Sequence, residues 1–281
     1  MHTQKLNARQ RRTKILVTIV MVLFTFTMVF PLLWMLSTSF KIESEVFSFP
    51  IKWITPNFNL NNYAEIWSGR YDFLQYYLNT IKVTVIVVVV QLVISSMAAY
   101  AFAKLDFVGK GPLFALFLAT MMIPTQVTLV PQFMLMVKLK LYNTHAGLIL
   151  LFAFSVYGVF LLKQGMMSIP DSLVEAAKID GANHFTIFSR IIVPMSQPFI
   201  ATLAVMRFIW TWNDYQIPLV FLRSPKLFTL QLGMSAFSSQ SGVFYSLLMA
   251  ASVCAIVPLL IVFICSQKFV IEGMTAGAVK G

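Results

Sequence analysis

Six long apolar runs, separated by more polar segments, dominate the pattern of this 281-residue chain. At ~1.5 Å per residue, a helix of such a length crosses a hydrocarbon layer about 30 Å thick. The pattern therefore predicts an all-α integral membrane protein with six transmembrane helices. The expected spans are residues 15–36, 80–103, 112–136, 145–163, 198–222 and 245–266.

The composition supports a membrane protein over a soluble one. Hydrophobic residues make up 58% of the chain and charged residues only 11%, which leaves too little polar surface to cover a soluble core. The net charge of +11 raises the question of nucleic acid. The basic residues, however, sit at the ends of apolar runs, which is the placement that membrane topology requires. We expect a lipid bilayer as the environment and no nucleic-acid partner.

The distribution of Lys and Arg predicts the orientation. The run at 15–36 exceeds the length of a secretory signal and no small-residue cleavage site follows it, so it is expected to remain as the first span. Six spans place both termini on one side. With the termini inside, the inner segments hold twelve Lys and Arg residues and the outer segments hold eight. The sequence thus predicts a multi-pass protein of the cell (inner) membrane with both termini in the cytoplasm.

The same pattern divides the chain into five parts. They are a cytoplasmic basic tail at 1–14, the first helix at 15–36, an extracytoplasmic segment at 37–79, a core at 80–267 with five helices, and a cytoplasmic tail at 268–281. Prolines fall inside several spans. Pro124 and Pro131 are expected to interrupt the third, Pro218 to end the fifth and Pro258 to lie within the sixth. Such breaks suit a pathway that opens and closes, although membrane proteins without transport activity also carry them.

Sequence signatures of catalysis are absent. The chain contains no GxxxxGK[ST] phosphate loop, no HExxH and no GxSxG, and its three histidines lie in different segments. Cys254 and Cys265 would be roughly 16 Å apart along one helix, too far for a disulfide. We therefore expect no catalytic residues, no metal site and no cofactor. Active transport by this chain would need an ion gradient or a separate ATPase.

A charged insert between the fourth and fifth spans, residues 170–198, stands out in so apolar a chain. Its residues predict a hairpin of two short helices. Gly181 provides a left-handed stop for the first helix, Asn183 caps the second and Pro194 ends it. The insert is either a docking element for a partner outside the bilayer or an amphipathic helix that merely links two spans.

The letters EAAKIDGANHFTIFSRIIVPMSQP within this insert resemble the EAA loop of binding-protein-dependent ABC transporter permeases. The family pattern is matched at Glu175, Ala176, Ala177, Gly181, Ile192 and Pro194, with Val193 where leucine is usual. The resemblance implies the fold of a type I ABC importer permease, with 170–194 as its cytoplasmic coupling loop. It also implies that Glu175, Ala176, Ala177, Asp180, Gly181 and Ala182 transmit movement driven by ATP.

Three further segments are similar to carbohydrate permeases of the maltose type: TWNDYQIPLVFL at 211–222, SPKLFTLQLGMSAF at 224–237 and FVIEGMTAGAVKG at 269–281. Besides the lipid bilayer already expected from the composition, this resemblance implies three kinds of protein partner: a second homologous permease, two ATP-binding cassette subunits and an extracytoplasmic solute-binding protein. ATP would be bound by the partner subunits. The implied solute is a carbohydrate, either an oligosaccharide or a glycoside, and the alternative is glycerol phosphate or another non-sugar solute.

Two charges inside the fifth span are candidates for the solute path. Arg207 and Asp214, seven residues apart, project to nearly the same helix face. Asp214 and Asn213 offer hydrogen bonds to sugar hydroxyls, or Asp214 instead holds helix ends together near the membrane interface. If these charges couple transport to an ion gradient, the chain is a secondary transporter. A scaffold or sensor without a solute path is a third interpretation.

Overall fold

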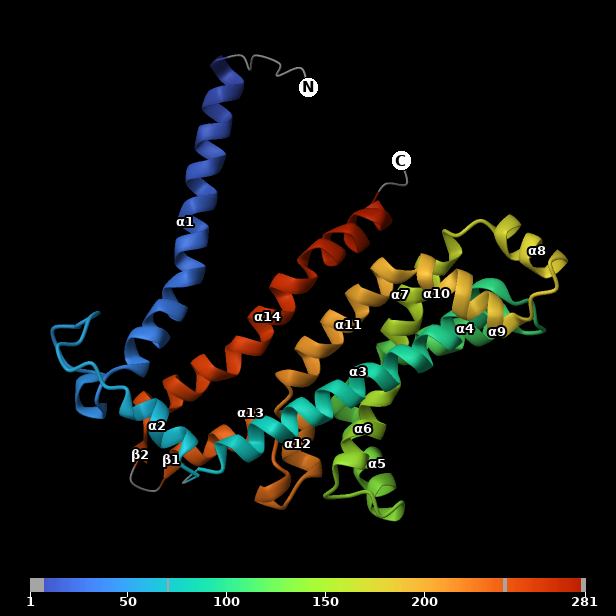
Figure 1. Ribbon diagram of the computed structural model, residues 1–281. Helices are drawn as coiled ribbons and strands as arrows, with labels where there is room; N and C mark the ends of the chain where they lie inside the picture. Colours follow the sequence, from blue (N-terminus) through green and yellow to red (C-terminus); the bar gives the residue numbers. More distant parts are fainter. Residues whose placement is uncertain (1–7, 70, 240–241, 279–281) are drawn as a thin grey trace. The chain divides into compact units, whose positions relative to one another are not determined.

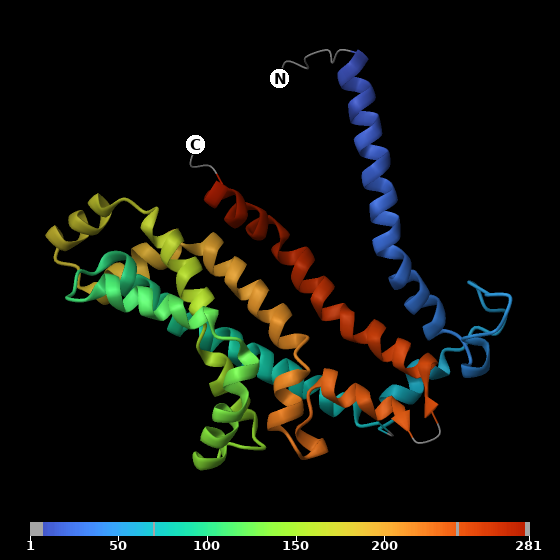
Figure 2. The same cartoon turned by 180° about the vertical axis from the view of Figure 1, so that it is seen from behind.

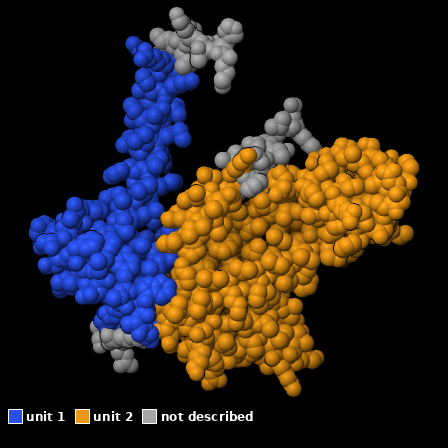
Figure 3. All heavy atoms as spheres, viewed as in Figure 1, with its two compact units in different colours: residues 1–71, 236–256 blue, residues 72–235, 257–281 orange. Residues whose placement is uncertain are grey.

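The computed structural model describes residues 8–69, 71–239 and 242–278. Two segments of sequence contribute to each of two compact units (Figure 3): residues 1–71 with 236–256, and residues 72–235 with 257–281. The predicted basic residue Lys5 and the end of the predicted tail at Lys280 lie outside the described residues.

The first unit contains the first span and extramembrane segments (Figure 1). Its elements are α1 (Ala8–Ser39), the 3-10 turn η1 (Glu43–Glu45), α2 (Asn61–Trp67), the two-residue strands β1 (Ser238–Ser239) and β2 (Gly242–Val243), and the beginning of α14 (Tyr245–Ala278). The strands pair antiparallel, with Ser238 opposite Val243. Asn62 organises the segment after α1, because its Nδ2 donates to the backbone oxygens of Ser39 and Lys41 at 2.9 and 2.8 Å.

The second unit is built on one long helix, α3 (Phe73–Lys104), and α7 (Val156–Met167), α11 (Gln197–Trp212) and α6 (His145–Ala153) pack along it. Its other elements, in chain order, are α4 (Lys110–Ala119), η2 (Thr120–Met122), α5 (Thr125–Lys138), α8 (Asp171–Ile179), α9 (His184–Ile187), the π-turn η3 (Phe188–Ile192), α10 (Val193–Met195), α12 (Gln216–Phe221), η4 (Pro225–Leu227), α13 (Leu230–Gly233), the start of η5 (Met234–Phe237) and α14 from Val257 onward. Figures 1 and 2 show α8 and α9 at one end of α3 and α13 at the other.

Among the described residues, three helices are long and apolar enough to cross a membrane without a break: Arg9–Ser39, Phe73–Lys104 and Tyr245–Lys268. Three further spans are helix pairs bent by 100°, 44° and 76°. Six spans thus arise when each bent pair is taken as one. Both long end helices extend further than predicted, since α1 begins at Ala8 and α14 continues to Ala278.

The third span bends by 100° between α4 and α5. Ile123 and Pro124 are both extended there, with ψ of 115° and 136°, as expected for a proline and the residue before it. The predicted interruption at Pro124 is therefore present. The predicted interruption at Pro131 is wrong, because α5 runs through that residue unbroken.

The fourth and fifth spans depart from the sequence prediction. The fourth bends by 44° because Ser155 caps α7, its Oγ accepting from the Gly158 N–H at 3.0 Å. The fifth ends at Trp212, and Pro218 lies inside the separate helix α12. The predicted range 198–222 is therefore too long, because Asn213 and Asp214 break the helix before Pro218.

Candidate functional site

The charged insert forms the predicted hairpin, and its turn is set by Gly181. That residue has φ of +80°, a conformation that costs a side-chain-bearing residue roughly 1–2 kcal/mol. The Gly181 N–H donates to Lys178 O at 3.0 Å and the Ala182 N–H donates to Ala177 O at 2.9 Å. These two bonds make a Schellman end for α8. The predicted glycine stop is confirmed.

The second arm begins as predicted but does not end at Pro194. Asn183 caps α9, with its Oδ1 accepting from the Thr186 N–H at 2.8 Å. The helical path then widens into the π-turn η3, closed by a bond from the Val193 N–H to Phe188 O. It continues through Pro194 and bends by 76° into α11. We attribute the π-turn to the proline, which has no N–H to donate and would crowd the carbonyl four residues earlier.

The hairpin has an inner face that packs against the rest of its unit. Val174 and Ala177 of α8 and Ile187 and Ile192 of the second arm are buried against a shared apolar core. The other members of this core include Ala99, Leu162, Met166, Ile169 and Leu203. Since both arms bury residues in one core, the hairpin is folded onto the helices that it connects.

The six predicted coupling residues divide between the two faces. Glu175, Ala176, Asp180 and Gly181 are exposed. Ala182 is half-buried and Ala177 belongs to the inner core. Large apolar side chains surround the exposed positions: Leu173 is 41% exposed, Ile179 86% and Phe185 73%. We call the surface of Leu173, Ala176, Ile179, Gly181 and Phe185 the hairpin crest.

Two side chains from the end of α3 contact the hairpin, and the sequence pattern did not reveal either one. Lys104 Nζ lies 2.6 Å from Asp171 Oδ1 and 2.6 Å from Ile169 O. Tyr100 Oη lies 3.3 Å from His184 Nδ1. The hydrogen bond and the charge of Lys104 both lower the pKa of Asp171. In the sequence, Lys104 is only one of several basic residues that follow an apolar run, so no local signal distinguishes it.

The candidate path residues lie at the other end of α11. Arg207 Cζ sits 4.7 Å from the centroid of the Phe152 ring. Its Nε and Nη2 are buried and have no hydrogen-bond partner. Asp214 Oδ1 accepts from the Ile217 N–H at 2.9 Å and so caps α12. Asn213 also hydrogen-bonds within its own helix, because its Nδ2 donates to Ile209 O at 2.9 Å. The structure gives no Arg207–Asp214 ion pair, and the bonding of Asp214 fits a residue that holds helix ends together.

A second group of polar side chains lies within the bundle and escaped the sequence analysis. Thr84, Gln91 and Ser95 of α3 are fully buried, and their side-chain polar atoms have no partner. A Cβ on Gly158 of α7 would lie 3.0 Å from Ser95 Oγ, so the two helices approach closely there. These residues sit within the predominantly apolar run at 80–103, where the high average hydropathy hides single polar positions.

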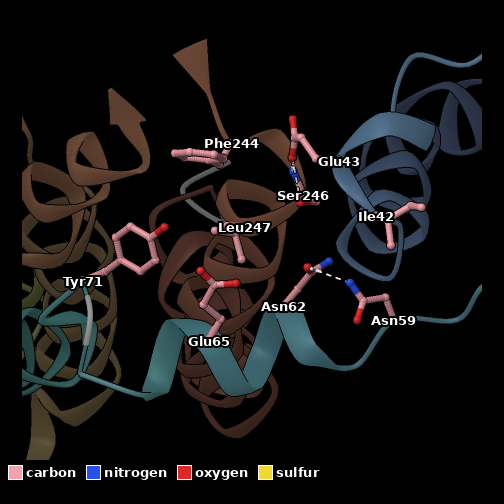
Figure 4. Close-up of a pocket in the computed structure, with 9 residues that line it drawn as sticks. All are labelled: Ile42, Glu43, Asn59, Asn62, Glu65, Tyr71, Phe244, Ser246 and Leu247. Atoms are coloured by element: carbon pink, nitrogen blue, oxygen red, sulfur yellow. Dashed lines mark hydrogen bonds between the residues drawn. The ribbon is translucent and has the colours of Figure 1, made fainter. Parts of the chain in front are cut away.

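The first unit contains a pocket of about 240 Å³ in the extramembrane region (Figure 4), lined by Ile42, Glu43, Asn59, Asn62, Glu65, Tyr71, Phe244, Ser246 and Leu247. Its polar groups are largely used by the fold. Glu43 accepts from the Tyr245 N–H and from the N–H and hydroxyl of Ser246, at 2.7–2.9 Å. It therefore caps α14. The part of the chain that the structure describes contains no cluster of three His, Cys, Asp or Glu side chains suited to a metal ion.

The chain matches a family of membrane transport components and several permease proteins. Residues 91–275 match the family described as binding-protein-dependent transport system inner membrane component. The chain is 36% identical over 268 residues to the arabinooligosaccharides transport system permease protein AraQ of Halalkalibacterium halodurans, covering 95% of this chain and 96% of that one. It is 34% identical over 251 residues to the melibiose/raffinose/stachyose import permease protein MelC of Bacillus subtilis, covering 88% and 90%.

A solved structure resembles nearly the entire chain. It is the crystal structure of a bacterial ABC transporter involved in the import of the acidic polysaccharide alginate, with a TM-score of 0.85. The sequence identity is 24%, and the likeness covers 95% of this chain and 99% of that chain. The predicted fold is thereby confirmed.

Proposed function

Because the chain belongs to the family of binding-protein-dependent transport system inner membrane components, we propose that it is a permease subunit of an ATP-driven importer for carbohydrate. The names of the relatives support the solute class, since arabinooligosaccharides, melibiose, raffinose and stachyose are all built from linked sugars. The solute of this chain is then an oligosaccharide or a glycoside.

The energy enters through partner subunits. The chain has no phosphate loop, so ATP is bound and hydrolysed by two ATP-binding cassette subunits on the cytoplasmic side. A second homologous permease completes the membrane pore, and an extracytoplasmic protein delivers the solute. Both termini and the hairpin at 170–194 face the cytoplasm, in agreement with the excess of Lys and Arg on that side.

The hairpin crest is the observation that carries this proposal. Leu173, Ile179 and Phe185 are exposed on an element whose own helices are only a few turns long. Such short helices are marginal alone, and here the inner face holds them in place. The small residues Ala176 and Gly181 between the large apolar ones allow a partner to approach the backbone closely. We therefore assign the crest as the docking surface for an ATPase subunit, with Glu175 and Asp180 at its edge.

We assign the solute path to the C-terminal end of α11, where Arg207 lies. Arg207 supports it best, because an ionisable side chain inside a span faces a cavity or a pathway by default and two of its nitrogen atoms have no partner. Asn213 and Asp214 lie nearby in sequence, and Asn213 Oδ1, which accepts only a long 3.5 Å bond from Gln231 Nε2, and the carboxylate of Asp214 offer acceptors to a sugar hydroxyl when the bundle opens. The unpaired guanidinium also motivates the second candidate function, a transporter driven by an ion gradient.

The test is uptake by proteoliposomes that contain the chain with all its partners. We expect ATP inside the vesicles to drive uptake of radiolabelled arabinotriose or raffinose, and an ion gradient without ATP to drive none. Uptake driven by the gradient alone would instead establish the secondary transporter. Uptake restricted to glycerol 3-phosphate would leave the ATP-driven mechanism in place and overturn the carbohydrate assignment.

Two matched glycine variants test the crest. Gly181→Asp adds a charge to the docking surface, and we expect uptake to fall at least about tenfold, equivalent to about 1.4 kcal/mol. Gly109→Asp is the control, because Gly109 has almost the same φ (+81° against +80°) and equally open surroundings. Backbone strain alone would affect both variants equally. Normal uptake by Gly181→Asp with assembled partners would remove the coupling role from the hairpin.

A further inference from the structure

The end of α3 holds both arms of the hairpin at once. Tyr100 and Lys104 are one helical turn apart and therefore lie on the same face of α3. Lys104 reaches the start of α8, and Tyr100 reaches the start of α9. The two contacts are thus placed on either side of the turn at Gly181.

Lys104 makes the stronger of the two contacts. Its side chain is only 3% exposed, and its Nζ is shared between Asp171 Oδ1 and Ile169 O, each at 2.6 Å. Hydrogen bonds between charged groups are short and about twice as strong as neutral ones. The charges also suit the helices, since the ammonium lies at the C-terminus of α3 and the carboxylate lies in the first turn of α8.

Tyr100 adds a contact to the second arm. Its side chain is buried, at 6% exposure, and the hydroxyl meets His184 Nδ1 at 3.3 Å. Its ring centroid lies 5.3 Å from that of Phe188, the first residue of the π-turn. The hairpin is therefore attached to α3 by a polar contact on each arm and by an aromatic pair.

We infer that Lys104 is a positioning residue for energy coupling, which ties the base of α8 to α3 so that a push on the hairpin crest moves α3. This inference rests on the proposed function. Since α3 packs along α7, α11 and α6, displacement of α3 carries the helices of the second unit with it. Without the tie, only the apolar core and the Tyr100 contacts would join the hairpin to α3, and more of its movement would be lost in bending at Ser168–Pro170.

The experiment compares Lys104→Met with wild type in the complete reconstituted transporter. Solute uptake and ATP hydrolysis are measured on the same vesicles, and amide hydrogen exchange of α8 is measured on the same complex. We expect uptake to fall about tenfold while ATP hydrolysis stays within about twofold of wild type. The amides of α8 should exchange about tenfold faster. Lys104→Arg should restore most of the uptake, because it retains the charge and two or more donors.

Lys110 provides a matched control. Its Nζ also bonds one backbone oxygen, Leu105 O at 2.7 Å, and one carboxylate, Asp106 Oδ1 at 3.4 Å, but neither belongs to the hairpin. Lys110→Met should leave the ratio of solute to ATP unchanged. A parallel fall of uptake and hydrolysis in Lys104→Met would mean that Lys104 serves assembly only. If Lys104→Met changes neither the amide exchange of α8 nor the ratio of solute transported to ATP hydrolysed, the inference is overturned as well.

The exchange measurement separates this inference from the proposed function. If α8 loosens in Lys104→Met but the wild-type complex shows no ATP-driven uptake, the tie exists and the importer assignment is wrong. If the wild type imports sugar and Gly181→Asp does not, while Lys104→Met is normal in both readouts, the importer stands and the tie is refuted.

Discussion

The hairpin at 170–194 and the segment at 207–214 both bring polar groups into an apolar chain, yet they use them in opposite ways. In the hairpin, Glu175 and Asp180 are exposed beside the crest. In the second segment, Asp214 caps a helix and Arg207 lies against Phe152 with two buried, unpaired nitrogens. The first region keeps its carboxylates exposed on the surface, while the second bonds Asp214 within the fold and buries Arg207.

The difference shows why motif and charge carry unequal weight in a membrane chain. A surface that must dock a partner needs small residues, exposed apolar groups and a defined turn at fixed spacing, and these leave a recognisable pattern. A polar group inside the bundle has several uses, such as a helix cap or a contact with an aromatic ring. Residue type alone does not separate these uses from contact with a solute.

The largest effect is expected when a bulky side chain fills the crest. Ala176 is exposed, so Ala176→Trp should leave the fold intact. The indole would occupy the space that a partner needs, and we expect affinity for the ATPase subunit to fall at least tenfold, or about 1.4 kcal/mol. The measurement is the fraction of ATPase that co-purifies with the permease, together with uptake.

The neighbouring alanine supplies the control for that substitution. Ala177 is 9% exposed and packs in the inner core, so Ala177→Trp should destabilise the protein by roughly 1–3 kcal/mol through overpacking. Thermal denaturation of the detergent-solubilised protein distinguishes the two variants. Loss of stability in Ala176→Trp, or full partner binding by that variant, would contradict the assignment of an outer docking face.

Removal of the buried guanidinium of Arg207 is expected to have the next largest effect. Arg207→Met removes two unpaired buried nitrogens, a gain of roughly 1–3 kcal/mol that the lost contact with Phe152 partly offsets. We expect stability to rise by about 1 kcal/mol and uptake to fall about tenfold. A rise in stability with normal uptake would remove Arg207 from the solute path. A parallel fall in both would make it a structural residue.

The sequence predicted the hairpin well because its geometry is set locally. Gly181 supplies a positive φ and Asn183 supplies a cap within a few residues of where they act. The six spans and the break at Pro124 were predicted, but the bends of 44° and 76° in the fourth and fifth spans were not. The cap at Ser155 was missed because a single serine in an apolar run has little effect on average hydropathy.

The contacts that join distant parts of the chain left no trace in the pattern. Lys104 and Asp171 are 67 residues apart and meet only because α3, α7 and the hairpin pack together. The π-turn before Pro194 likewise depends on a helix that continues past the proline, where local rules favoured an end. The Lys104–Asp171 contact depends on tertiary packing, which single-sequence periodicity does not contain, and so does the continuation of the helix that Pro194 then widens into a π-turn.

Substitutions of Asp214 separate its capping bond from its negative charge. Asp214→Ala removes the acceptor for the Ile217 N–H and should cost about 1 kcal/mol, as loss of a helix cap does. Asp214→Asn retains an acceptor oxygen at the same place. If the residue is a cap, the Asn variant should keep both stability and uptake near wild type. If uptake falls in the Asn variant while thermal stability is retained, the negative charge itself takes part in transport.

The smallest expected effect is a pH dependence confined to the hairpin. The hydrogen bond and charge of Lys104, with a smaller contribution from the charge of Lys110, lower the pKa of Asp171. The stabilisation is therefore fully present above the unfolded pKa of about 3.9 and is lost as the pH falls through the lower folded value. Corrected for intrinsic exchange, protection of the α8 amides should be constant between about pH 8 and pH 5 and should weaken below about pH 4.

Asp171→Asn should abolish this step while the amides of α11 serve as the internal reference. If the loss of protection at low pH persists in Asp171→Asn, another group causes the acid sensitivity. The Lys104–Asp171 contact then makes no measurable contribution to the protection of α8.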